Sequence, residues 1–291
     1  MQQLLPPVRI HSWGGLGSQL FAIALAEDFK IIYPKRSLRI VLHTGGVTRR
    51  IPEVVDLFPD FEYQYIEDFQ PKHGTSKDIS SRSKFNSRKS LLKFVTALGF
   101  LAYCNEDSST KRLLPWVLSI RGHYSYRSIN SNFLSGLAEK CRIIEKSLEV
   151  DFKTACTIHY RLGDLLTITE KNPISAKSVA SEFIMIRNQI NFSKLIVFSD
   201  SPTEAHKRFT SLITDEIMIL DLTAILVISG AVNSKYFIGT SSKISFWIAG
   251  IRAVVYRKRS SLPGENFVQY ASLSGDQSHL IDTYVALSEQ T

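Results

Sequence analysis

The sequence predicts an α/β protein made of two Rossmann-like halves that face a central cleft, on three observations. Residues 8–43 run as a strand, a glycine-rich loop, a helix and a second strand. From residue 154 onward, short apolar segments again alternate with helical ones. The apolar run 155–158 ends in charged residues, as a buried parallel strand does when it carries polar groups to a ligand. We therefore expect two domains, residues 1–150 and 151–291, with the last helix packing back on the first domain.

In the first half, a strand is expected at residues 8–12 and a tight loop at residues 13–18. A helix is expected at residues 19–33, because apolar residues recur there at helical spacing until Pro34 stops it. The other elements expected here are a strand at 38–43, a short helix within 48–58, a short strand at 61–66, an apolar helix at 90–103, and one or two helices between 115 and 148, the clearest at 130–144.

In the second half, the pattern predicts strands and helices in turn. Ser201 suits an N-cap and Pro202 a first helical residue, because proline lacks the amide proton that a first turn leaves unpaired. The expected strands are at 154–159, 194–199, 217–220, 236–238 and 253–256, and the expected helices at 178–189, 201–209, 221–233 and 244–251.

Composition indicates a folded, basic protein. Hydrophobic residues make up 44% of the 291 residues and aromatic residues 11%, enough for a substantial core. Thirty-five Lys and Arg against 27 Asp and Glu give a net charge of +8. This charge suggests an anionic partner: a nucleotide phosphate, a nucleic acid or an acidic lipid surface. Cys104, Cys141 and Cys156 form no metal-binding or disulfide pattern and favour a reducing compartment.

The sequence also suggests a cytoplasmic protein. Its first residues lack the basic and apolar regions of a signal peptide, and no apolar run reaches the length of a membrane span. The segment 71–93 carries seven Lys and Arg residues and one acid. This segment is expected to be a solvated loop; the alternative is a basic flap that meets an anionic acceptor or a membrane lipid.

The candidate site centres on residues 155–164. His159 and Arg161 are two residues apart, so on an extended strand both side chains leave the same face. Gly163 would allow a sharp turn, and Asp164 could orient the arginine or accept a proton. The alternative interpretation is a structural ion pair between Arg161 and Asp164 at the end of a strand.

A glycine-rich segment at residues 14–19 lies between a strand and a helix. Its glycines, which include Gly15 and Gly17, would let backbone N–H groups approach a ligand. The segment is not the GxGxxG dinucleotide fingerprint, and a simple tight turn is the alternative. Gln19 could contact a ligand or cap the turn.

Two further polar segments follow in the second half. Asp200 ends a strand, where a carboxylate can accept hydrogen bonds from a ribose or a base; the alternative is a helix N-cap. Ser241 and Ser242 precede a helix, where hydroxyls and free N–H groups suit a phosphate. An ordinary serine-rich N-cap is the alternative there.

Taken in order, these segments resemble the α1,2/α1,6/protein O-fucosyltransferase superfamily, most closely the bacterial α1,2-fucosyltransferases of glycosyltransferase family 11. The family's GGLGNQLF-type loop is matched at residues 14–21, with Ser18 in place of asparagine. Its HVRRGD motif is matched at residues 159–164, with Leu162 in place of the second arginine. An FSD segment is matched at residues 198–200, and an NSTFSWW segment loosely at residues 241–247. The resemblance spans most of the chain.

The resemblance implies a GT-B-like fold, a GDP-fucose donor bound mainly by the second half, inversion at the anomeric carbon, and neither a cofactor nor a required metal. Arg161 would hold the β-phosphate as charge builds on the leaving GDP. A guanidinium can replace a divalent cation there, because it is always charged and binds phosphate oxygens in pairs. Asp164 is the first candidate for the catalytic base. The donor-binding residues implied are Gly15, Gly17, Ser18, Gln19, His159, Arg161, Asp200, Ser241 and Ser242.

The expected reaction moves fucose to a sugar hydroxyl, with galactose as the expected acceptor sugar, in a bacterial surface glycan such as O-antigen polysaccharide. A glycan or lipid-linked oligosaccharide acceptor fits a peripheral position at the inner face of the plasma membrane. Leu162 and Ser18 leave another nucleotide-sugar donor open. The net charge leaves a nucleic-acid-binding protein open, but aromatic residues do not interleave the basic ones, so no nucleic acid is expected. A non-catalytic scaffold is the third alternative.

Overall fold

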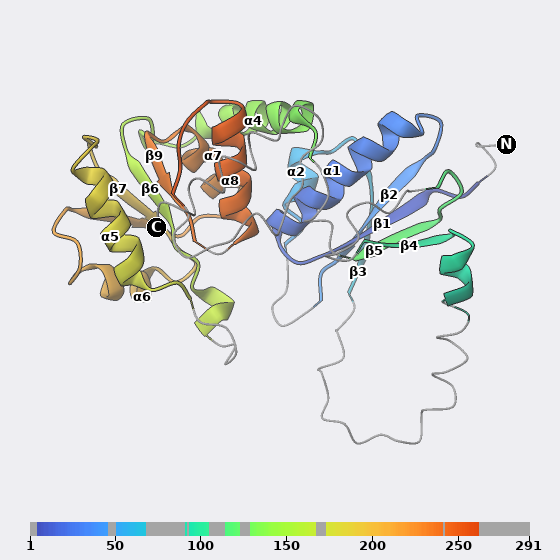
Figure 1. Cartoon of the computed structure of the whole chain (residues 1–291), viewed down its shortest axis with the longest axis horizontal. Helices are drawn as coiled ribbons and strands as arrows, with labels where there is room; N and C mark the ends of the chain where they lie inside the picture. Colours follow the sequence, from blue (N-terminus) through green and yellow to red (C-terminus); the bar gives the residue numbers. More distant parts are fainter. Residues whose placement is uncertain are drawn as a thin grey trace, which may run out of the picture. The chain divides into compact units, whose positions relative to one another are not determined.

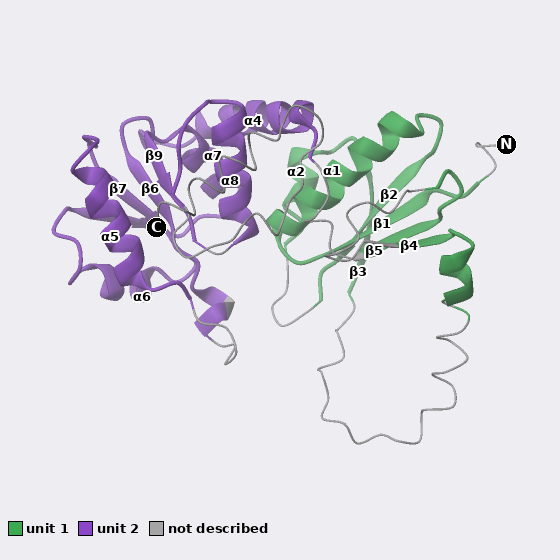
Figure 2. Cartoon of the chain, in the orientation of Figure 1, with its two compact units in different colours: residues 1–128 green, residues 129–291 purple. Residues whose placement is uncertain are grey.

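The computed structural model describes residues 5–45, 51–67, 91, 93–104, 114–122, 129–166, 173–240 and 242–261, apart from the side chains of residues 103, 104 and 164. The chain divides into two compact units, residues 1–128 and 129–291, and each is built on a parallel β-sheet (Figures 1 and 2). The predicted α/β class with two successive Rossmann-like halves is confirmed.

Unit 1 is organised around β1, the central strand of a five-stranded parallel sheet with the order β3-β2-β1-β5-β4. The chain adds β2 and β3 on one side of β1, and then β4 and β5 on the other. The order therefore reverses between β1 and β5, and open α/β sheets place ligands beyond the strand carboxyl ends at such a point. The elements are β1 (Val8–Trp13), α1 (Leu16–Ile32), β2 (Leu38–His43), α2 (Val54–Leu57), β3 (Glu62–Ile66), β4 (Leu101–Cys104) and β5 (Ser119–Gly122).

The first helix, α1, packs against β1 and β2 and is buried along most of its length. Tyr33 still donates its N–H to the carbonyl of Phe29, but Pro34 has no N–H with which to continue, so the helix ends. The turn before α1 is shorter than the sequence suggests. Because β1 runs to Trp13 and α1 starts at Leu16, only Gly14 and Gly15 lie between them.

Unit 2 contains a four-stranded parallel sheet with the order β8-β7-β6-β9. Here the order reverses between β6 and β9. The elements are α4 (Ser131–Glu145), β6 (Cys156–His159), the 3₁₀ helix η4 (Gly163–Leu166), α5 (Ala176–Arg187), β7 (Leu195–Phe198), α6 (Pro202–Phe209), β8 (Ile217–Leu220), α7 (Ala224–Asn233), β9 (Tyr236–Ile238) and α8 (Lys243–Val254).

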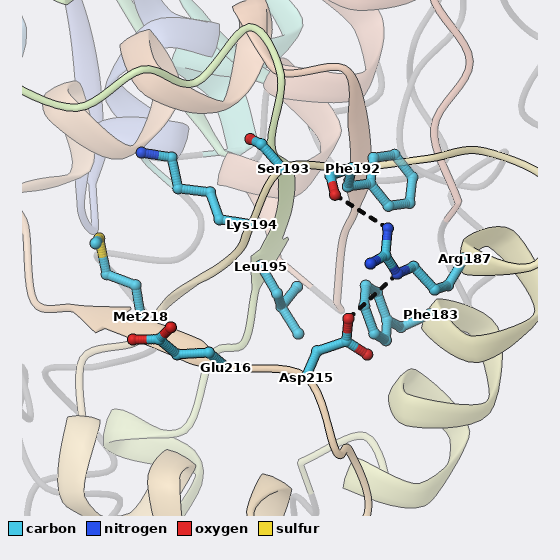
Figure 3. A pocket seen from close by; sticks show the side chains of 9 residues that line it. All are labelled: Phe183, Arg187, Phe192, Ser193, Lys194, Leu195, Asp215, Glu216 and Met218. Carbon is cyan, nitrogen blue, oxygen red and sulfur yellow. Dashed lines mark hydrogen bonds and ion pairs between the residues drawn. The ribbon is translucent and has the colours of Figure 1, made fainter.

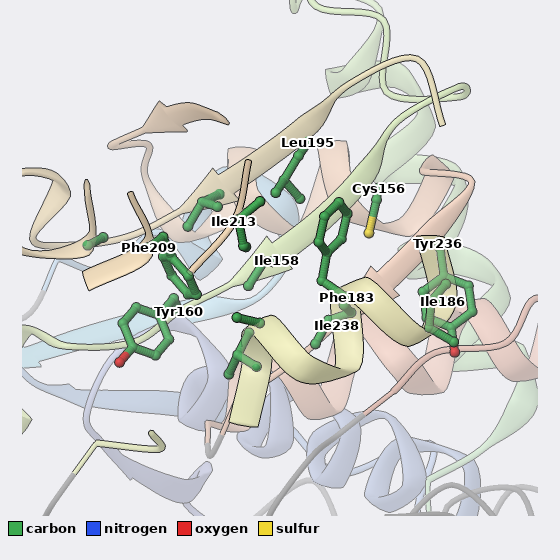
Figure 4. Close-up of a cluster of buried hydrophobic side chains, with 14 of the residues drawn as sticks. Cys156, Ile158, Tyr160, Phe183, Ile186, Leu195, Phe209, Ile213, Tyr236 and Ile238 are labelled. Carbon is green, nitrogen blue, oxygen red and sulfur yellow. The ribbon is translucent and has the colours of Figure 1, made fainter. Parts of the chain in front are cut away.

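A continuous apolar core joins one face of this sheet to α5 and α6 (Figure 4). Alternate residues of β6 and of the chain after it point into this core, and they are Cys156, Ile158, Tyr160 and Leu162. Thr157 and His159 point the other way, toward Ser234 after α7 and Ser245 in α8. The period of two along β6 thus separates a core-forming face from a polar face.

Three segments differ from the sequence-based expectation. Residues 93–97 are helical, but residues 101–104 form β4 instead of continuing the helix, and β5 lies in the region 115–148 where only helices were expected. Short apolar runs do not reveal by periodicity whether they are helix or strand, and here pairing between β4 and β5 decides. Residues 253–256 were expected as a strand, but α8 continues to Val254.

The boundary between the units also differs from the predicted one near residue 150, since the compact units divide after Ser128. The difference is α4, which packs on α7 and α8. Its Phe133 meets Trp247 edge-on at 5.8 Å, and its Glu145 accepts a hydrogen bond from Asn233. The last helix, expected to pack back on the first domain, falls outside the described residues.

Candidate functional site

The polar segments that the sequence singles out in unit 2 come together where its strand order reverses. β6 ends at His159, β9 ends at Ile238, and the two strands are neighbours. Residues 239–242 then lead from β9 into α8, whose N-cap is Ser242. Two segments far apart in the sequence thus meet at the carboxyl edge of one sheet, the usual ligand position in this class of fold.

His159 contacts two serine hydroxyls through the same ring nitrogen. Its Nδ1 lies 2.8 Å from Ser245 Oγ and 3.2 Å from Ser242 Oγ. Ser245 Oγ already accepts the backbone N–H of Thr240 at 3.1 Å, so its own proton is available to Nδ1. This network favours the tautomer that carries its proton on Nε2, from which the ring can donate to a ligand oxygen.

The imidazole of His159 is neutral at physiological pH. Desolvation lowers its pKa to about 4; the charge of Asp200 opposes this shift and that of Arg161 adds to it. A neutral ring with a fixed Nε2–H can bind a phosphate or sugar oxygen without first taking up a proton.

Thr240 ties the two strand ends together, a role that the sequence does not reveal. Its hydroxyl donates to the carbonyl of His159 at 2.8 Å and accepts the backbone N–H of Arg161 at 3.2 Å. One side chain therefore fixes the backbone on both sides of Tyr160. Ser245 was likewise missed, because its position inside α8 resembles that of any helical serine.

Arg161 is partly exposed, whereas its two neighbours are fully buried. Tyr160 donates its hydroxyl to the carbonyl of Ile174 at 3.0 Å, and Leu162 belongs to the apolar core. Position 162 is where this chain departs from the fucosyltransferase motif. The Leu162 side chain points into the apolar core. The leucine at this position therefore leaves the polar face that carries His159 unchanged.

Asp200 holds the chain that follows β6. Its Oδ1 accepts the backbone N–H groups of Leu162 at 2.9 Å and Gly163 at 2.8 Å. A Cβ atom on Gly163 would lie 2.1 Å from Asp200 Oδ2, so a larger residue would displace the carboxylate from its two N–H donors. Asp200 is not the N-cap of α6; that position belongs to Ser201, followed by Pro202 as the sequence predicts. The carboxylate thus positions the segment that carries Arg161.

The glycine-rich segment forms the carboxyl end of β1 in unit 1. Gly14 has φ +100°, which L-residues rarely adopt, and Gly15 is the N-cap of α1. Gly17 and Ser18 already lie in the first turn of that helix. Gln19 is buried, donates to the carbonyls of Gly14 and Ile51 and accepts the N–H of Val54, so its amide joins the turn to α2.

A stack of rings at the ends of β1 and β2 is a second feature that the sequence did not indicate. His11 Nδ1 and His43 Nε2 are 2.9 Å apart, and Trp13 stacks on His43 with ring centroids 4.1 Å apart. Both histidines are buried and Trp13 is partly exposed. Trp13 ends β1, so the stack adjoins the glycine turn that follows.

Some predicted site residues cannot be compared with the structure. The side chain of Asp164, within η4, and the whole of Ser241 fall outside the described residues, as does most of the basic segment 71–93. Within the described part of the chain, no three His, Cys, Asp or Glu side chains come together as a metal site requires. Metal independence stays a prediction. Cys141 and Cys156 are buried free thiols.

A cavity of about 180 Å³ lies at the opposite edge of the unit 2 sheet, near the amino ends of β7 and β8 (Figure 3). Arg187 spans one side, paired with Asp215 at 3.2 Å and donating to the carbonyl of Phe192 at 3.0 Å. Lys194, Glu216 and other residues complete the wall. None of the predicted site residues lines it, so we place the candidate site at the carboxyl edge instead.

No protein-family model and no curated protein sequence matches the chain. Solved structures do match. POFUT1 in complex with GDP-fucose is 11% identical, with a TM-score of 0.42 over 88% of this chain and 98% of that one. A family 9 glycosyltransferase from Veillonella parvula is 10% identical, with a TM-score of 0.46 over 97% and 94%. A UDP-GlcNAc 2-epimerase from Neisseria meningitidis is 10% identical, with a TM-score of 0.48 over 96% and 91%. At these scores, the similarities decide neither family nor donor.

Proposed function

We propose that the chain is an inverting, metal-independent glycosyltransferase that moves fucose from GDP-fucose to a sugar hydroxyl of a bacterial surface glycan, with unit 2 binding the donor. One observation carries this proposal. His159, Thr240, Ser242 and Ser245 form a single hydrogen-bonded network at the point where the strand order of unit 2 reverses, on the same strand end as Arg161. The fucose donor comes from the sequence resemblance, because the network itself would suit any nucleoside diphosphate.

In the proposed reaction, the acceptor hydroxyl attacks the anomeric carbon from the face opposite GDP. The bond between that carbon and the β-phosphate oxygen breaks, and its electron pair stays on the phosphate. Arg161 meets this growing charge with its guanidinium, and the Nε2–H of neutral His159 donates a further hydrogen bond. Charge-assisted hydrogen bonds that strengthen as the leaving group departs lower the barrier without a metal ion.

The acceptor hydroxyl also loses a proton, which a base must accept. Asp164 is the proposed base, since it follows Arg161 by three residues. Orienting Arg161 is an equally suitable role for the same carboxylate. The two roles predict different kinetics. If Asp164 is the base, the rate of transfer rises with pH as its carboxyl group loses its proton. If Asp164 orients Arg161, its loss instead weakens the affinity for the donor.

The test is Arg161→Ala, assayed for fucose transfer or for hydrolysis of GDP-fucose without acceptor. We expect kcat/KM to fall by about 100-fold or more, and GDP binding to weaken, because the charge that builds on the leaving phosphate loses its guanidinium partner. Thermal unfolding should stay unchanged, since Arg161 is partly exposed. Arg142→Ala, an exposed arginine of α4, is the matched control. Turnover in Arg161→Ala equal to that of the control would contradict the proposal.

The donor is tested separately, because Ser18 departs from the family motif. A ligand that binds only the folded state raises the melting temperature, so GDP, UDP, dTDP and CMP are compared on the same protein. A rise with GDP alone supports a GDP-linked donor, and the hydrolysis assay with GDP-fucose then tests the sugar. If another nucleotide raises the melting temperature more, the proposed donor is wrong, while the fold and the proposed role of Arg161 still stand.

A further inference from the structure

The edge of unit 1 opposite the glycine turn exposes large apolar side chains. The amino ends of parallel strands share one edge of a sheet, and residues 91–100 lead into β4 while Trp116 precedes β5. Five exposed side chains lie there: Leu91 (63% exposed), Phe94 (61%), Leu98 (46%), Phe100 (37%) and Trp116 (42%). We call these five residues the amino-edge patch.

The members of the amino-edge patch are neighbours in space. Leu91, Phe94 and Leu98 recur at helical spacing, and residue 91 and residues 93–97 are helical. Trp116 Nε1 donates to the carbonyl of Leu98 at 2.9 Å. The carbonyl of Phe100 accepts the N–H of Leu118, two residues after Trp116, at 2.8 Å. A group of this size on a protein surface indicates an interaction site.

Exposed basic residues share this edge of the sheet with the amino-edge patch. Arg9, Lys35 and Lys93 are exposed at the starts of β1, β2 and the segment leading to β4. The Arg9 backbone N–H bonds the carbonyl of Leu118, and the buried Arg36 donates Nη2 to the carbonyl of Val117 at 3.0 Å. Arg9, through its backbone, and Arg36, through its buried guanidinium, thus contact the chain just beyond Trp116.

Two described acids of unit 1 lie away from the patch. Asp60 and Glu62 belong to the start of β3, at the opposite end of the strand order, where Glu62 pairs with Arg39. In the sequence, the patch begins at Leu91, near the end of the segment 71–93, which has seven Lys and Arg, Lys93 included, and one acid. Exposed basic residues thus accompany the patch in the described part of unit 1, and further basic residues precede it in the sequence.

We propose that the amino-edge patch docks unit 1 onto an anionic phospholipid bilayer. Apolar side chains enter the boundary between head groups and acyl chains, while Lys and Arg at their rim attract anionic head groups. Tryptophan favours this boundary because its ring is apolar and its N–H is polar, and the Trp116 N–H is already satisfied by Leu98. The glycine turn lies at the opposite edge of the sheet and stays accessible. The proposal stands independently of the donor.

No helix among the described residues is long and apolar enough to cross a bilayer. Binding is measured by cosedimentation of the full-length chain with vesicles, one set of phosphatidylcholine and one of phosphatidylcholine and phosphatidylglycerol in equal amounts. The chain is expected to sediment with the anionic vesicles, and less so as salt screens the charges. Emission of Trp116 should shift to shorter wavelength on binding, and Trp116→Phe should lose that shift.

Two pairs of matched variants test the surface itself. Leu91→Ser with Phe94→Ser should lower the affinity for anionic vesicles about tenfold or more, because two exposed apolar side chains are lost. Ile143→Ser with Ile184→Ser, exposed apolar residues of unit 2, should leave the affinity unchanged. Arg9→Gln, Lys35→Gln and Lys93→Gln together should also lower it about tenfold or more. Lys146→Gln, Lys177→Gln and Lys207→Gln, exposed in unit 2, should lower it less.

Thermal unfolding of each variant identifies any loss of fold, and the tryptophan shift provides a second readout in the intact chain. Absence of binding to anionic vesicles would overturn the proposal, and a protein partner would then be the alternative for this surface. Equal loss of affinity in the patch variants and their unit 2 controls would overturn it too.

Discussion

At the scale of single residues, His159 owes its protonation state to its surroundings. The ring lies at the end of a buried strand, and its Nδ1 is within hydrogen-bond distance of the hydroxyls of Ser242 and Ser245. Burial disfavours the imidazolium more than the nearby Asp200 favours it, so the pKa falls to about 4. The site thereby keeps a neutral hydrogen-bond donor beside the permanent charge of Arg161.

This shift predicts how stability depends on pH. Between pH 6.5 and 4, the unfolded chain binds a proton at His159 that the folded chain does not, so the free energy of unfolding falls as pH falls through this window. The loss is on the order of 3 kcal/mol. Urea unfolding at several pH values checks it: His159→Asn, which keeps an acceptor for Ser245, should show a smaller fall than wild type. His206→Asn, at an exposed position of α6, should not. Equal pH profiles in wild type and His159→Asn would refute the assignment.

Gly163 is the residue whose identity is fixed most directly by its contacts. Gly163→Ala should lower the free energy of unfolding by roughly 1–3 kcal/mol, because its Cβ would meet Asp200 Oδ2 at 2.1 Å. The same substitution should cost less in an Asp200→Ala background, where the clash is absent. Gly136→Ala, with open space around the new Cβ within α4, should be neutral or stabilising. Urea unfolding is measured for the wild type and the four variants, and an equal cost of Gly163→Ala in both backgrounds would contradict the contact.

At the scale of elements, α8 depends on one buried arginine. Arg252 has no exposed surface, and its guanidinium donates to the carbonyls of Ala231, Val232 and Ser234 at the end of α7 and to the carbonyl of Arg259. Burial lowers its pKa to about 10, so the group stays charged at pH 7. A cation at the carboxyl end of a helix also complements the helix dipole. These bonds connect α7, α8 and the segment after α8.

Arg252→Met should therefore destabilise unit 2 by about 3–5 kcal/mol, since it removes the buried charge together with its hydrogen bonds to several buried carbonyls. Arg252→Lys should cost less, because it keeps the charge and some of the donors. The measurement is the midpoint of urea unfolding, monitored by the fluorescence of Trp247, which is buried in α8. An Arg252→Met protein as stable as the wild type would show that the network contributes little.

At the scale of the whole molecule, both units use the same plan: a parallel sheet whose strand order reverses beside its first strand. The motifs that the sequence singles out fall at the carboxyl ends of these first strands, β1 with the glycine turn and β6 with His159. The amino edge of unit 1 carries the apolar and basic surface instead. In our proposals, ligand contact and membrane docking would therefore take opposite ends of the strands in unit 1.

The sequence by itself determined the α/β class, the two halves and most helices and strands, because apolar periodicity, glycine turns and Pro34 act locally. It also located His159 and Arg161 at a strand end. Other facts came only from tertiary structure. Residues 101–104 became a strand by pairing with β5, and α4 joined unit 2 by packing on α7 and α8. Thr240 and Ser245 acquired their roles because β9 lies beside β6, and Asp200 because its carboxylate reaches Gly163. Contacts between residues distant in the chain leave no periodic trace in the sequence, and for that reason only the folded structure revealed them.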